Sequence, residues 1–434
     1  MKVAIIGAGI SGLTAAYYLK RHHQVSVFEV ADKIGGHTAT VDINHQGSDY
    51  AIDTGFIVFN DWTYPNFIEL MDELGVESEP TEMSFSVRCE NSGIEYGGNN
   101  LNTMFAQRRN LLRPSFHKMI RDILKFNREA IRDLDCGNIS QTTTLGEYLR
   151  ANQYGEAFIY QYILPMGCAI WSASTERMID FPLRFFVQFF KNHGLLSVNN
   201  RPQWRVIKGG SRSYLDPLTE GFSKSISINA NISRIRRLGD SVELIMSDGR
   251  VLAYDHIVLA CHSDQALSLL QDASFAERNA LSAIPYQQNE VVLHTDENLL
   301  PRRRGAWSSW NYLLRERFQE RAVLTYNMNI LQGIKSDSTF CVTLNATESI
   351  SPAKIIDRFN YSHPVFSLDS VLATNRIEQI NGNNNTWFAG AYLGNGFHED
   401  GVVSGRQVAT AINRLPSSPL SADNLTTTVE GADA

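Results

Sequence analysis

The sequence predicts an α/β protein of two domains, in which a dinucleotide-binding domain is interrupted by a second domain of mixed α and β structure. A strand–turn–helix–strand unit occupies the first thirty or so residues, and a glycine-rich segment leads into another helix near residue 400. Between them the apolar pattern changes period several times, and no linker-like segment separates consecutive modules. Interleaved domains are therefore expected.

The first unit has the pattern of a βαβ motif. Residues 3–6 form a short apolar run, residues 13–20 have helical character, and residues 24–30 alternate as a second strand. The turn between strand and helix is Gly7-Ala8-Gly9-Ile10-Ser11-Gly12. This spacing permits a tight turn, a close approach of backbone to pyrophosphate, and close packing of helix on strand. The phosphates are expected at the helix N-terminus, with the Glu29 carboxylate on a ribose hydroxyl.

A second glycine pair, Gly35-Gly36, follows the carboxylate strand and leads through His37 into a predicted hairpin. The pair is either a plain turn or a point where the backbone passes close to the cofactor. Residues 38–43 and 50–53 flank the turn around Gly47. The segment that closes the hairpin either meets the cofactor or caps the strand end, and it reads Asp53-Thr54-Gly55-Phe56.

The middle of the chain alternates between helical and strand patterns. Helices are expected over residues 66–74, 114–134 and most of 145–193, and strands over 225–259, 289–345 and 386–389. One helical stripe forms either ordinary core or the wall of an apolar substrate tunnel, and it contains Phe181, Phe185, Phe186, Phe189 and Phe190. The expected division assigns 1–65, 200–285 and 385–415 to the dinucleotide-binding domain, 66–199 and 286–384 to the second domain, and 416–434 to a disordered tail.

Residues 387–405 carry the most informative pattern. A strand ends at Gly390, a glycine-rich loop follows, and a helix is expected to start near Asp400-Gly401. The free N–H groups and partial positive charge of that helix would face the part of a bound cofactor where negative charge collects on reduction.

With these segments the chain resembles the flavin-containing amine oxidase and phytoene-desaturase superfamily over nearly all of residues 1–415. Residues 309–312, 325–332 and 396–401 are similar to a bacterial amine-oxidase-like subgroup of predicted NAD/FAD-binding proteins associated with cyclopropane-fatty-acid-synthase-type enzymes. The resemblance implies an amine-oxidase-like fold: an interrupted Rossmann-type FAD-binding domain with an α+β substrate domain. The implied FAD-binding residues are Gly7, Gly9, Ile10, Ser11, Gly12, Glu29, Gly35, Gly36, His37, Thr38, Thr54, Gly55, Phe56, Ile232, Gly390, Ala391, Asp400, Gly401 and Val402.

The sequence departs from amine oxidases at three places. His37 stands where they usually carry arginine, and no cysteine lies between Gly390 and Gly405, so the FAD is expected to be noncovalent. His398 falls about where amine oxidases place an aromatic residue beside the flavin. With Glu399 it is the candidate for acid–base or substrate-orienting work, because imidazole titrates near neutral pH. The alternative is a histidine that only hydrogen-bonds the loop.

The composition of the chain limits the partners and the cellular setting that are expected. A net charge of −7 argues against a nucleic-acid partner. Five scattered cysteines without a CxxC pair indicate neither a disulfide framework nor a metal site, and fit a cytoplasmic setting. No apolar run is long enough for a transmembrane span, although a lipid substrate would imply contact with a membrane surface. No oligomeric state is predicted.

The leading functional hypothesis is an FAD-dependent oxidoreductase that takes a hydride from a C–H bond to flavin N5, with a fatty-acyl or other lipid substrate ranked above an amine. This ranking rests on the subgroup and on His398. The alternative substrate is a primary or secondary amine. Two other classes stay open: a nicotinamide-dependent dehydrogenase, which leaves residues 390–405 unexplained, and a non-catalytic escort protein on the FAD fold.

Overall fold

The computed structural model describes residues 1–416, and its first domain is built on a parallel sheet. The strand order is β10-β2-β1-β14-β20, which reads Ile226–Ser227, Gln24–Phe28, Lys2–Ile6, His256–Leu259 and Thr386–Phe388. These five strands come from three separate stretches of the chain, so the sheet is complete only when its last strand joins. The predicted tail over 416–434 lies outside the described residues, apart from residue 416.

Alternate side chains of β1 enter two different cores. Val3 and Ile5 pack in a core with α1 (Ile10–Leu19) and α15 (His398–Asn413), while Ala4 and Ile6 pack on the opposite face. Both faces of a parallel strand are covered in this way, which explains its continuous apolar run. The second face is covered by the sheet β11 (Ile232–Arg237), β12 (Val242–Met246) and β13 (Val251–Tyr254), with helices α11 (Ser263–Leu269), α12 (Phe275–Leu281) and α14 (Leu368–Ile380).

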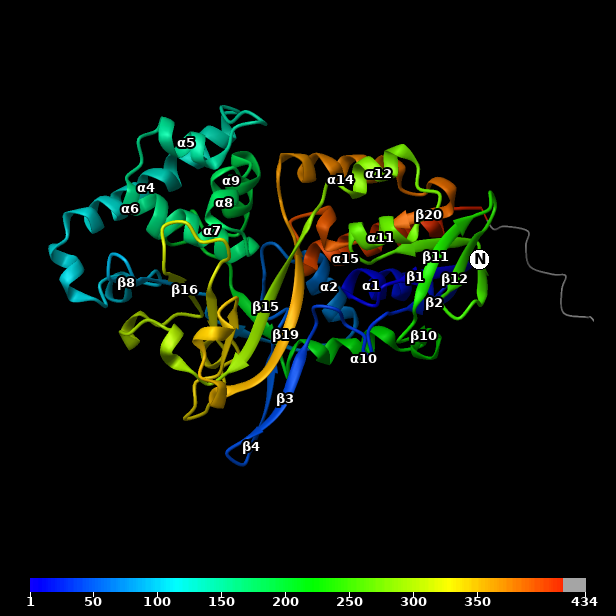
Figure 1. Ribbon diagram of the computed structural model, residues 1–434, viewed down its shortest axis with the longest axis horizontal. Helices are drawn as coiled ribbons and strands as arrows, with labels where there is room; N and C mark the ends of the chain where they lie inside the picture. The colour runs from blue at the N-terminus through cyan, green and yellow to red at the C-terminus, as the bar shows by residue number, and fades with distance from the viewer. Residues whose placement is uncertain (417–434) are drawn as a thin grey trace, which may run out of the picture.

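The second domain is built on a seven-stranded mixed sheet. Its order is β19-β15-β18-β17-β16-β7-β8, which reads Ile355–Pro364, Tyr286–His294, Cys341–Leu344, Leu324–Asn327, Trp310–Leu314, Phe85–Cys89 and Ile94–Gly97. The two long strands β15 and β19 pair antiparallel along their lengths and run through the middle of the molecule (Figure 1). They connect the helical side of the second domain with the region of the parallel sheet.

Helices cover one side of this sheet and form the largest apolar core. They gather at the end of the molecule far from the parallel sheet (Figure 1). Their bounds are α3 Leu101–Met104, α4 Pro114–Asp135, α5 Leu145–Ala151, α6 Glu156–Phe158, α7 Leu164–Trp171, α8 Thr175–Ile179 and α9 Leu183–Asn192. The aromatic stripe of α9 lies mostly in this core: Phe186, Phe189 and Phe190 are buried, and Phe185 is half-buried.

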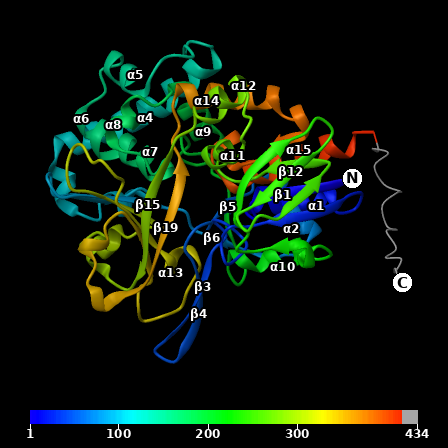
Figure 2. The same ribbon diagram turned by 45° about the vertical axis from the view of Figure 1, so that its right-hand side comes forward.

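Smaller elements connect the two domains. The hairpin β3–β4 (Thr40–His45, Ser48–Asp53) projects from the molecule in both views (Figures 1 and 2). Its turn residues Gln46 and Gly47 have φ of 53° and 80°, the backbone conformation of a two-residue type I′ turn. The rest are β5 Phe59–Asn60, β6 Ser78–Thr81, β9 Trp204–Ile207, α2 Pro65–Glu73, α10 Leu215–Thr219 and α13 Met328–Leu331.

Several predicted elements differ from the observed ones. The region 289–345, expected as long strands, contains most of the long strand β15 and then only the short strands β16, β17 and β18, separated by α13 and 3-10 turns. The last helix begins at His398, close to the expected start near Asp400. Strand β19 and helix α14 were not predicted at all. No helix among residues 1–416 is long and apolar enough to cross a membrane.

Candidate functional site

The first glycine turn has the geometry of a phosphate cradle. Gly7 has φ of 106°, and a Cβ there would lie 2.7 Å from the Ala260 carbonyl oxygen. A Cβ on Gly12 would collide with the Gly7 carbonyl, so helix and strand touch through backbone. A Cβ on Gly9, in contrast, would meet nothing within 4 Å. Gly9 is the N-cap of α1 and provides no side-chain cap, so the first N–H groups of the helix stay available to an anion.

Glu29 lies beside this cradle. Its carboxylate accepts hydrogen bonds from the N–H of Ala8 at 2.7 Å and from the N–H of Ala31 at 2.9 Å. The backbone that leads to Ile232 passes alongside, because the Ala230 N–H donates to the Glu29 carbonyl. Glu29 and Ile232, which are far apart in the sequence, therefore border the same end of the cradle.

The second glycine pair packs on the first turn. Gly35 and Gly36 have φ of 114° and 59°, and the Gly35 N–H donates to the Ala8 carbonyl at 2.8 Å. A Cβ on Gly36 would lie 3.2 Å from the Cα of Gly9. The two predicted turns thus form one continuous backbone surface.

The segment that closes the hairpin adjoins this surface. A Cβ on Gly55 would collide with the His37 carbonyl, and the Phe56 N–H donates to that same carbonyl at 2.7 Å. The buried Asp53 carboxylate accepts from the N–H and hydroxyl of Ser211 and from the Thr40 hydroxyl. Burial raises its pKa to about 6 in spite of these bonds. Asp53 thus holds the end of the hairpin against the segment at Ser211. These contacts correspond to the strand-end role that the sequence left open beside a cofactor contact.

The C-terminal segment brings a second helix N-terminus to the same place. A Cβ on Gly401 would lie 2.7 Å from Ile10 Cγ2 and 2.9 Å from Ser11 Oγ, so α15 and α1 meet closely at their first turns. Asp400 caps α15 by accepting from the Phe397 N–H at 2.9 Å, and burial raises its pKa to about 6. Gly390 donates its N–H to the Ser404 hydroxyl at 3.0 Å, which holds the start of the loop at Ala391 against α15, the helix that contains Val402.

These backbone features fit a dinucleotide. The cradle combines open space at Gly9, two helix N-termini and two turns that leave no room for side chains at their contact points. Among residues 1–416 no group of histidine, cysteine or acidic side chains could hold a metal ion.

His398 lies in the first turn of α15 at the border of the cradle. Its ring stacks on Phe56 with 3.6 Å between ring centroids, and its Nε2 lies 3.1 Å from the Thr38 hydroxyl, which also bonds to Tyr214. Burial lowers the pKa of His398 to about 3, so the ring is neutral. The reason that suggested acid–base work, titration near neutral pH, does not hold in this environment; the catalytic role stays a prediction.

The Glu399 side chain bonds to helix α2 rather than to the residues around His398. Its carboxylate accepts from the N–H and side-chain amide of Asn66 and from the N–H of Phe67 at 2.8 Å. These donors belong to the first turn of α2, whose own N-cap residue provides no side-chain bond. Glu399 therefore caps α2 from outside that helix.

Three further residues near His37 were not predicted. The His37 ring lies 5.1 Å from the Tyr361 ring and 5.3 Å from the His363 ring, and both of these belong to β19. Tyr361 also bonds through its hydroxyl to Thr54 at 3.1 Å. His262, after β14, stacks on Tyr286 with 4.2 Å between centroids. The only available signal was the period-two spacing of Tyr361 and His363 in an unpredicted strand.

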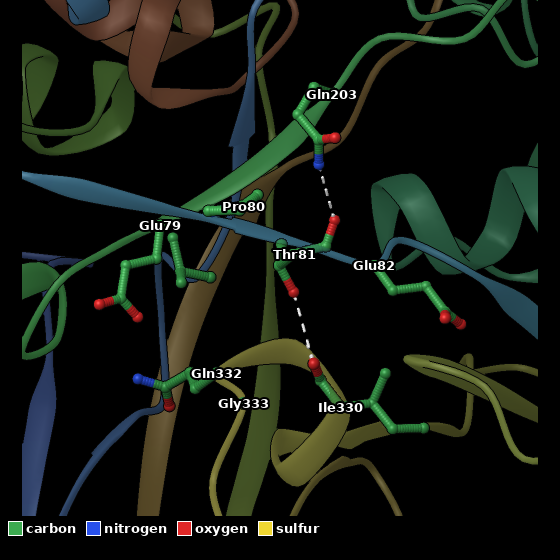
Figure 3. A pocket seen from close by; sticks show the side chains of 9 residues that line it. Glu79, Pro80, Thr81, Glu82, Gln203, Ile330, Gln332 and Gly333 are labelled. Atoms are coloured by element: carbon green, nitrogen blue, oxygen red, sulfur yellow. Dashed lines mark hydrogen bonds between the residues drawn. The ribbon is translucent and has the colours of Figure 1, made fainter.

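A separate surface groove of about 480 Å³ lies between β6, β9 and α13 (Figure 3). Gln203 donates to the Thr81 carbonyl at 3.1 Å across it, and Gln332 connects it to the hairpin by accepting from the Asp53 N–H. Its lining residues are Glu79, Pro80, Thr81, Glu82, Gln203, Val206, Ile330, Gln332 and Gly333. No glycine turn or helix N-terminus of the cradle lines it, so we do not place the reaction there.

Comparisons with known proteins agree with a dinucleotide-binding role for the cradle. The family model described as flavin containing amine oxidoreductase matches residues 10–322. The chain is 25% identical over 273 residues to a probable flavin-containing monoamine oxidase A of Dictyostelium discoideum, covering 59% of this chain and 56% of that one. It is 24% identical over 265 residues to a putative flavin-containing monoamine oxidase of Mycobacterium tuberculosis, covering 58% and 55%. The chain spans about half the length of these curated relatives.

Solved structures share the fold over 95% of this chain. Cyclohexylamine oxidase from Brevibacterium oxydans has a TM-score of 0.66 at 17% identity and is covered over 98% of its length. A putative protoporphyrinogen oxidase from Exiguobacterium has 0.67 at 16%, and a fatty acid isomerase from P. acnes has 0.65 at 18%, each covered over 98%. At these identities the likeness establishes the amine-oxidase-like two-domain architecture and no more.

Proposed function

Because the chain belongs to the flavin-containing amine oxidoreductase family, we propose that it is an FAD-dependent oxidoreductase that removes a hydride from a C–H bond of an organic substrate. FAD is the cofactor of this family, and when bound it supplies the hydride acceptor. The match covers residues 10–322, and the cradle described above adds the C-terminal contribution from Gly390 onward.

Different segments of the chain would bind different parts of FAD. Gly9, Ile10 and Ser11 would bind the pyrophosphate at the start of α1, and Glu29 would bind a ribose. The first turn of α15 would present its N–H groups to the flavin. His398, held by Thr38 and by stacking on Phe56, would orient the reacting groups as a neutral hydrogen-bonding ring.

For the substrate we propose an apolar molecule of the fatty-acyl or related lipid class. The supporting observation is an aromatic cluster that ends beside His398: Phe189 stacks on Phe397, and Phe185 stacks on Phe366, with 5.4 Å between centroids in each pair. Phe397 contacts both the helical core and the core of the parallel sheet, so the cluster joins the substrate domain to the cradle. None of these side chains carries a charge that would attract an ammonium group.

An amine substrate is the alternative, and the curated relatives named as monoamine oxidases favour it. The solved structures include both a cyclohexylamine oxidase and a fatty acid isomerase, so the fold does not choose between the classes. Aromatic faces also attract ammonium groups, which makes the same cluster compatible with an amine.

The test starts from the purified protein under anaerobic conditions. A yellow protein whose visible flavin absorbance bleaches with dithionite supports the oxidoreductase; a colourless protein that does not take up added FAD would contradict it. Bleaching by fatty acids or phospholipid-bound acyl chains, with none by monoamines or polyamines, would support the lipid class. The reverse pattern would establish the amine alternative.

A further inference from the structure

A chain of buried amides fixes the protonation of His363. The Glu290 N–H donates to the Asn345 side-chain oxygen at 3.2 Å, and the Asn345 amide donates to Asn289 Oδ1 at 2.9 Å. Asn289, which is fully buried, can then only donate through Nδ2, and it does so to His363 Nδ1 at 3.1 Å. A ring nitrogen that accepts a hydrogen bond carries no proton.

The remaining proton of His363 is therefore on Nε2. Burial lowers the pKa of His363 to about 4, so the ring is neutral and has this single N–H. Nε2 makes no hydrogen bond to the described residues, and because it is not one of their buried side-chain atoms, it is open to a ligand or to solvent. The relay thus holds a donor whose acceptor is missing from residues 1–416.

The ring of His37 provides a second nitrogen that is unpaired among residues 1–416, and this one is buried. His37 lies beside His363, and its Nε2 is buried without a partner among the described residues. Its backbone follows Gly36, which packs on Gly9 in the phosphate cradle. Burial and the neighbouring His363, His262 and His398 rings lower the pKa of His37 well below its usual range.

Leaving the buried His37 nitrogen unpaired costs about 1–3 kcal/mol. Because the open N–H of His363 lies beside it, one ligand that reaches both nitrogens would remove that cost. One of them is fixed as a donor, and the histidines around the pair are neutral, so the ligand must supply a hydrogen-bond acceptor. An oxygen with negative charge is the strongest such acceptor for an N–H group.

We propose that His363 and His37 together bind an anionic oxygen next to the phosphate cradle. The oxygen comes from one of two sources: the FAD itself, or the carboxylate of an apolar substrate. The second source rests on the proposed function and deepens it, because it specifies a free carboxylic acid as the substrate class. His363 acts in either case as a binding residue, and Asn289 and Asn345 act as positioning residues.

The experiment compares His363→Phe, which removes the donor, with His363→Gln, which keeps an amide donor. His117→Phe is the matched control, because His117 is an exposed residue on α4 away from the cradle. Two quantities are measured on each protein. The first is the dissociation constant of FAD for the apoprotein, together with the midpoint potential of the flavin. The second is the dissociation constant of oleate compared with oleyl alcohol, read from the visible spectrum of the oxidised flavin.

If FAD is the source, His363→Phe weakens FAD binding or lowers the midpoint potential, and His363→Gln restores part of the loss. If a substrate carboxylate is the source, the wild-type protein prefers oleate over oleyl alcohol, and His363→Phe removes that preference while FAD binding is unchanged. The expected size is about tenfold to a hundredfold in the affected constant, the typical value of a hydrogen bond to a charged group.

The proposal is overturned if FAD affinity, midpoint potential and carboxylate preference are all the same in His363→Phe and in His117→Phe. Should His363→Phe fail to fold, the ¹⁵N shifts of the wild-type histidines give the answer, with the His363 signal assigned by its loss in His363→Gln. A signal that does not report an Nε2–H tautomer, or that is unmoved by both FAD and oleate, overturns the proposal. Bleaching by amines together with weaker FAD binding in His363→Phe would reject the lipid substrate and keep this site.

Discussion

At the scale of single residues, glycines of the same turn have different functions. Gly12 is required by the protein's own packing, because a side chain there would strike the Gly7 carbonyl. Gly9 has φ of −79°, and a Cβ there would meet nothing within 4 Å, so the fold itself does not require glycine at this position. The space at Gly9 is left for a ligand, whereas the space at Gly12 is filled by the chain.

Gly9→Ala and Gly12→Ala should therefore separate ligand binding from folding. We expect Gly9→Ala to change the free energy of unfolding of the apoprotein by less than about 1 kcal/mol and to weaken FAD binding at least about tenfold. Gly12→Ala should destabilise the apoprotein as well. Urea unfolding of the apoproteins and titration with FAD measure both effects. Equal FAD affinity in Gly9→Ala and the wild type would show that the phosphates do not lie there.

The neutral ring of His398 predicts a pH dependence of stability. Its pKa is about 3 in the folded chain, whereas an unperturbed histidine has a pKa of 6.5, so between these values only the unfolded chain binds the proton. The free energy of unfolding then falls as the pH is lowered through this window, and it is unaffected above pH 6.5. Between pH 7 and pH 5 this histidine accounts for about 2 kcal/mol.

His398→Gln should remove that part of the pH dependence. The measurement is urea unfolding of wild type and variant at pH 7 and pH 5, with FAD saturating. His193 and His294, whose pKa values burial lowers to about 4, will still destabilise both proteins at low pH. A wild-type pH dependence no steeper than that of the variant would mean that His398 is protonated in the folded protein.

At the scale of elements, helices α2 and α15 are joined by side chains that bond across from one helix to the other. Glu399 belongs to α15 but caps α2, and Asn66 of α2 in turn accepts from Arg406 of α15. No pattern within either helix indicates this, because the cap comes from a residue more than three hundred positions away. The sequence analysis names Glu399 with His398 as a candidate for acid–base or substrate-orienting work, which stays a prediction; the contacts of its carboxylate are with α2.

Glu399→Ala should cost stability and leave catalysis nearly unchanged. The N–H groups of Asn66 and Phe67 would lose their acceptor, which we expect to lower the free energy of unfolding by about 1–2 kcal/mol. Glu69→Ala is the control, because it removes an exposed ion pair with Arg406 and should cost less than about 1 kcal/mol. The rate of flavin reduction, measured by rapid mixing, tests whether Glu399 also acts in catalysis. A rate about a hundredfold lower in Glu399→Ala than in the wild type would show that Glu399 is an acid–base residue.

Local patterns predicted some elements well and others not at all. The turn at Gly7–Gly12, the hairpin around Gly47 and the helix that begins at Pro114 have strong local signals of glycine spacing and apolar periodicity. Strand β19 has only a weak signal, the period-two spacing of Phe359, Tyr361 and His363, because it is an edge strand with few aliphatic residues. The residues that lie on it, Tyr361 and His363, were therefore missed together with the strand.

At the scale of the whole molecule, the cofactor site is assembled from segments far apart in the chain. The cradle uses residues 7–12, 35–36 and 390–402, and the parallel sheet draws its strands from 2–28, 226–259 and 386–388. The sequence predicted this interruption from changes of period and by family resemblance. It could not predict which side chains of the second domain would reach the cradle, since that depends on how β15 and β19 cross between the domains.

FAD binding should therefore stabilise the entire molecule rather than one segment. We expect FAD at a hundred times its dissociation constant to raise the free energy of unfolding by about 2.7 kcal/mol. FMN, which lacks the adenosine half that Glu29 and Ile232 would bind, should give a smaller shift in melting temperature. NAD, which has no flavin for the α15 end, should also give less. A shift with NAD as large as that with FAD would contradict the assignment of the C-terminal segment to the flavin.

The late position of β20 and α15 has a consequence for synthesis of the protein. Strand β20 completes the parallel sheet beside β14, and α15 covers the face of α1 that is otherwise apolar. On the ribosome, the nascent chain exposes that face of α1 until α15 has been made. Exposed apolar surface of this kind makes a nascent chain prone to aggregation. The parallel sheet and its helical cover therefore close only after both β20 and α15 have been made.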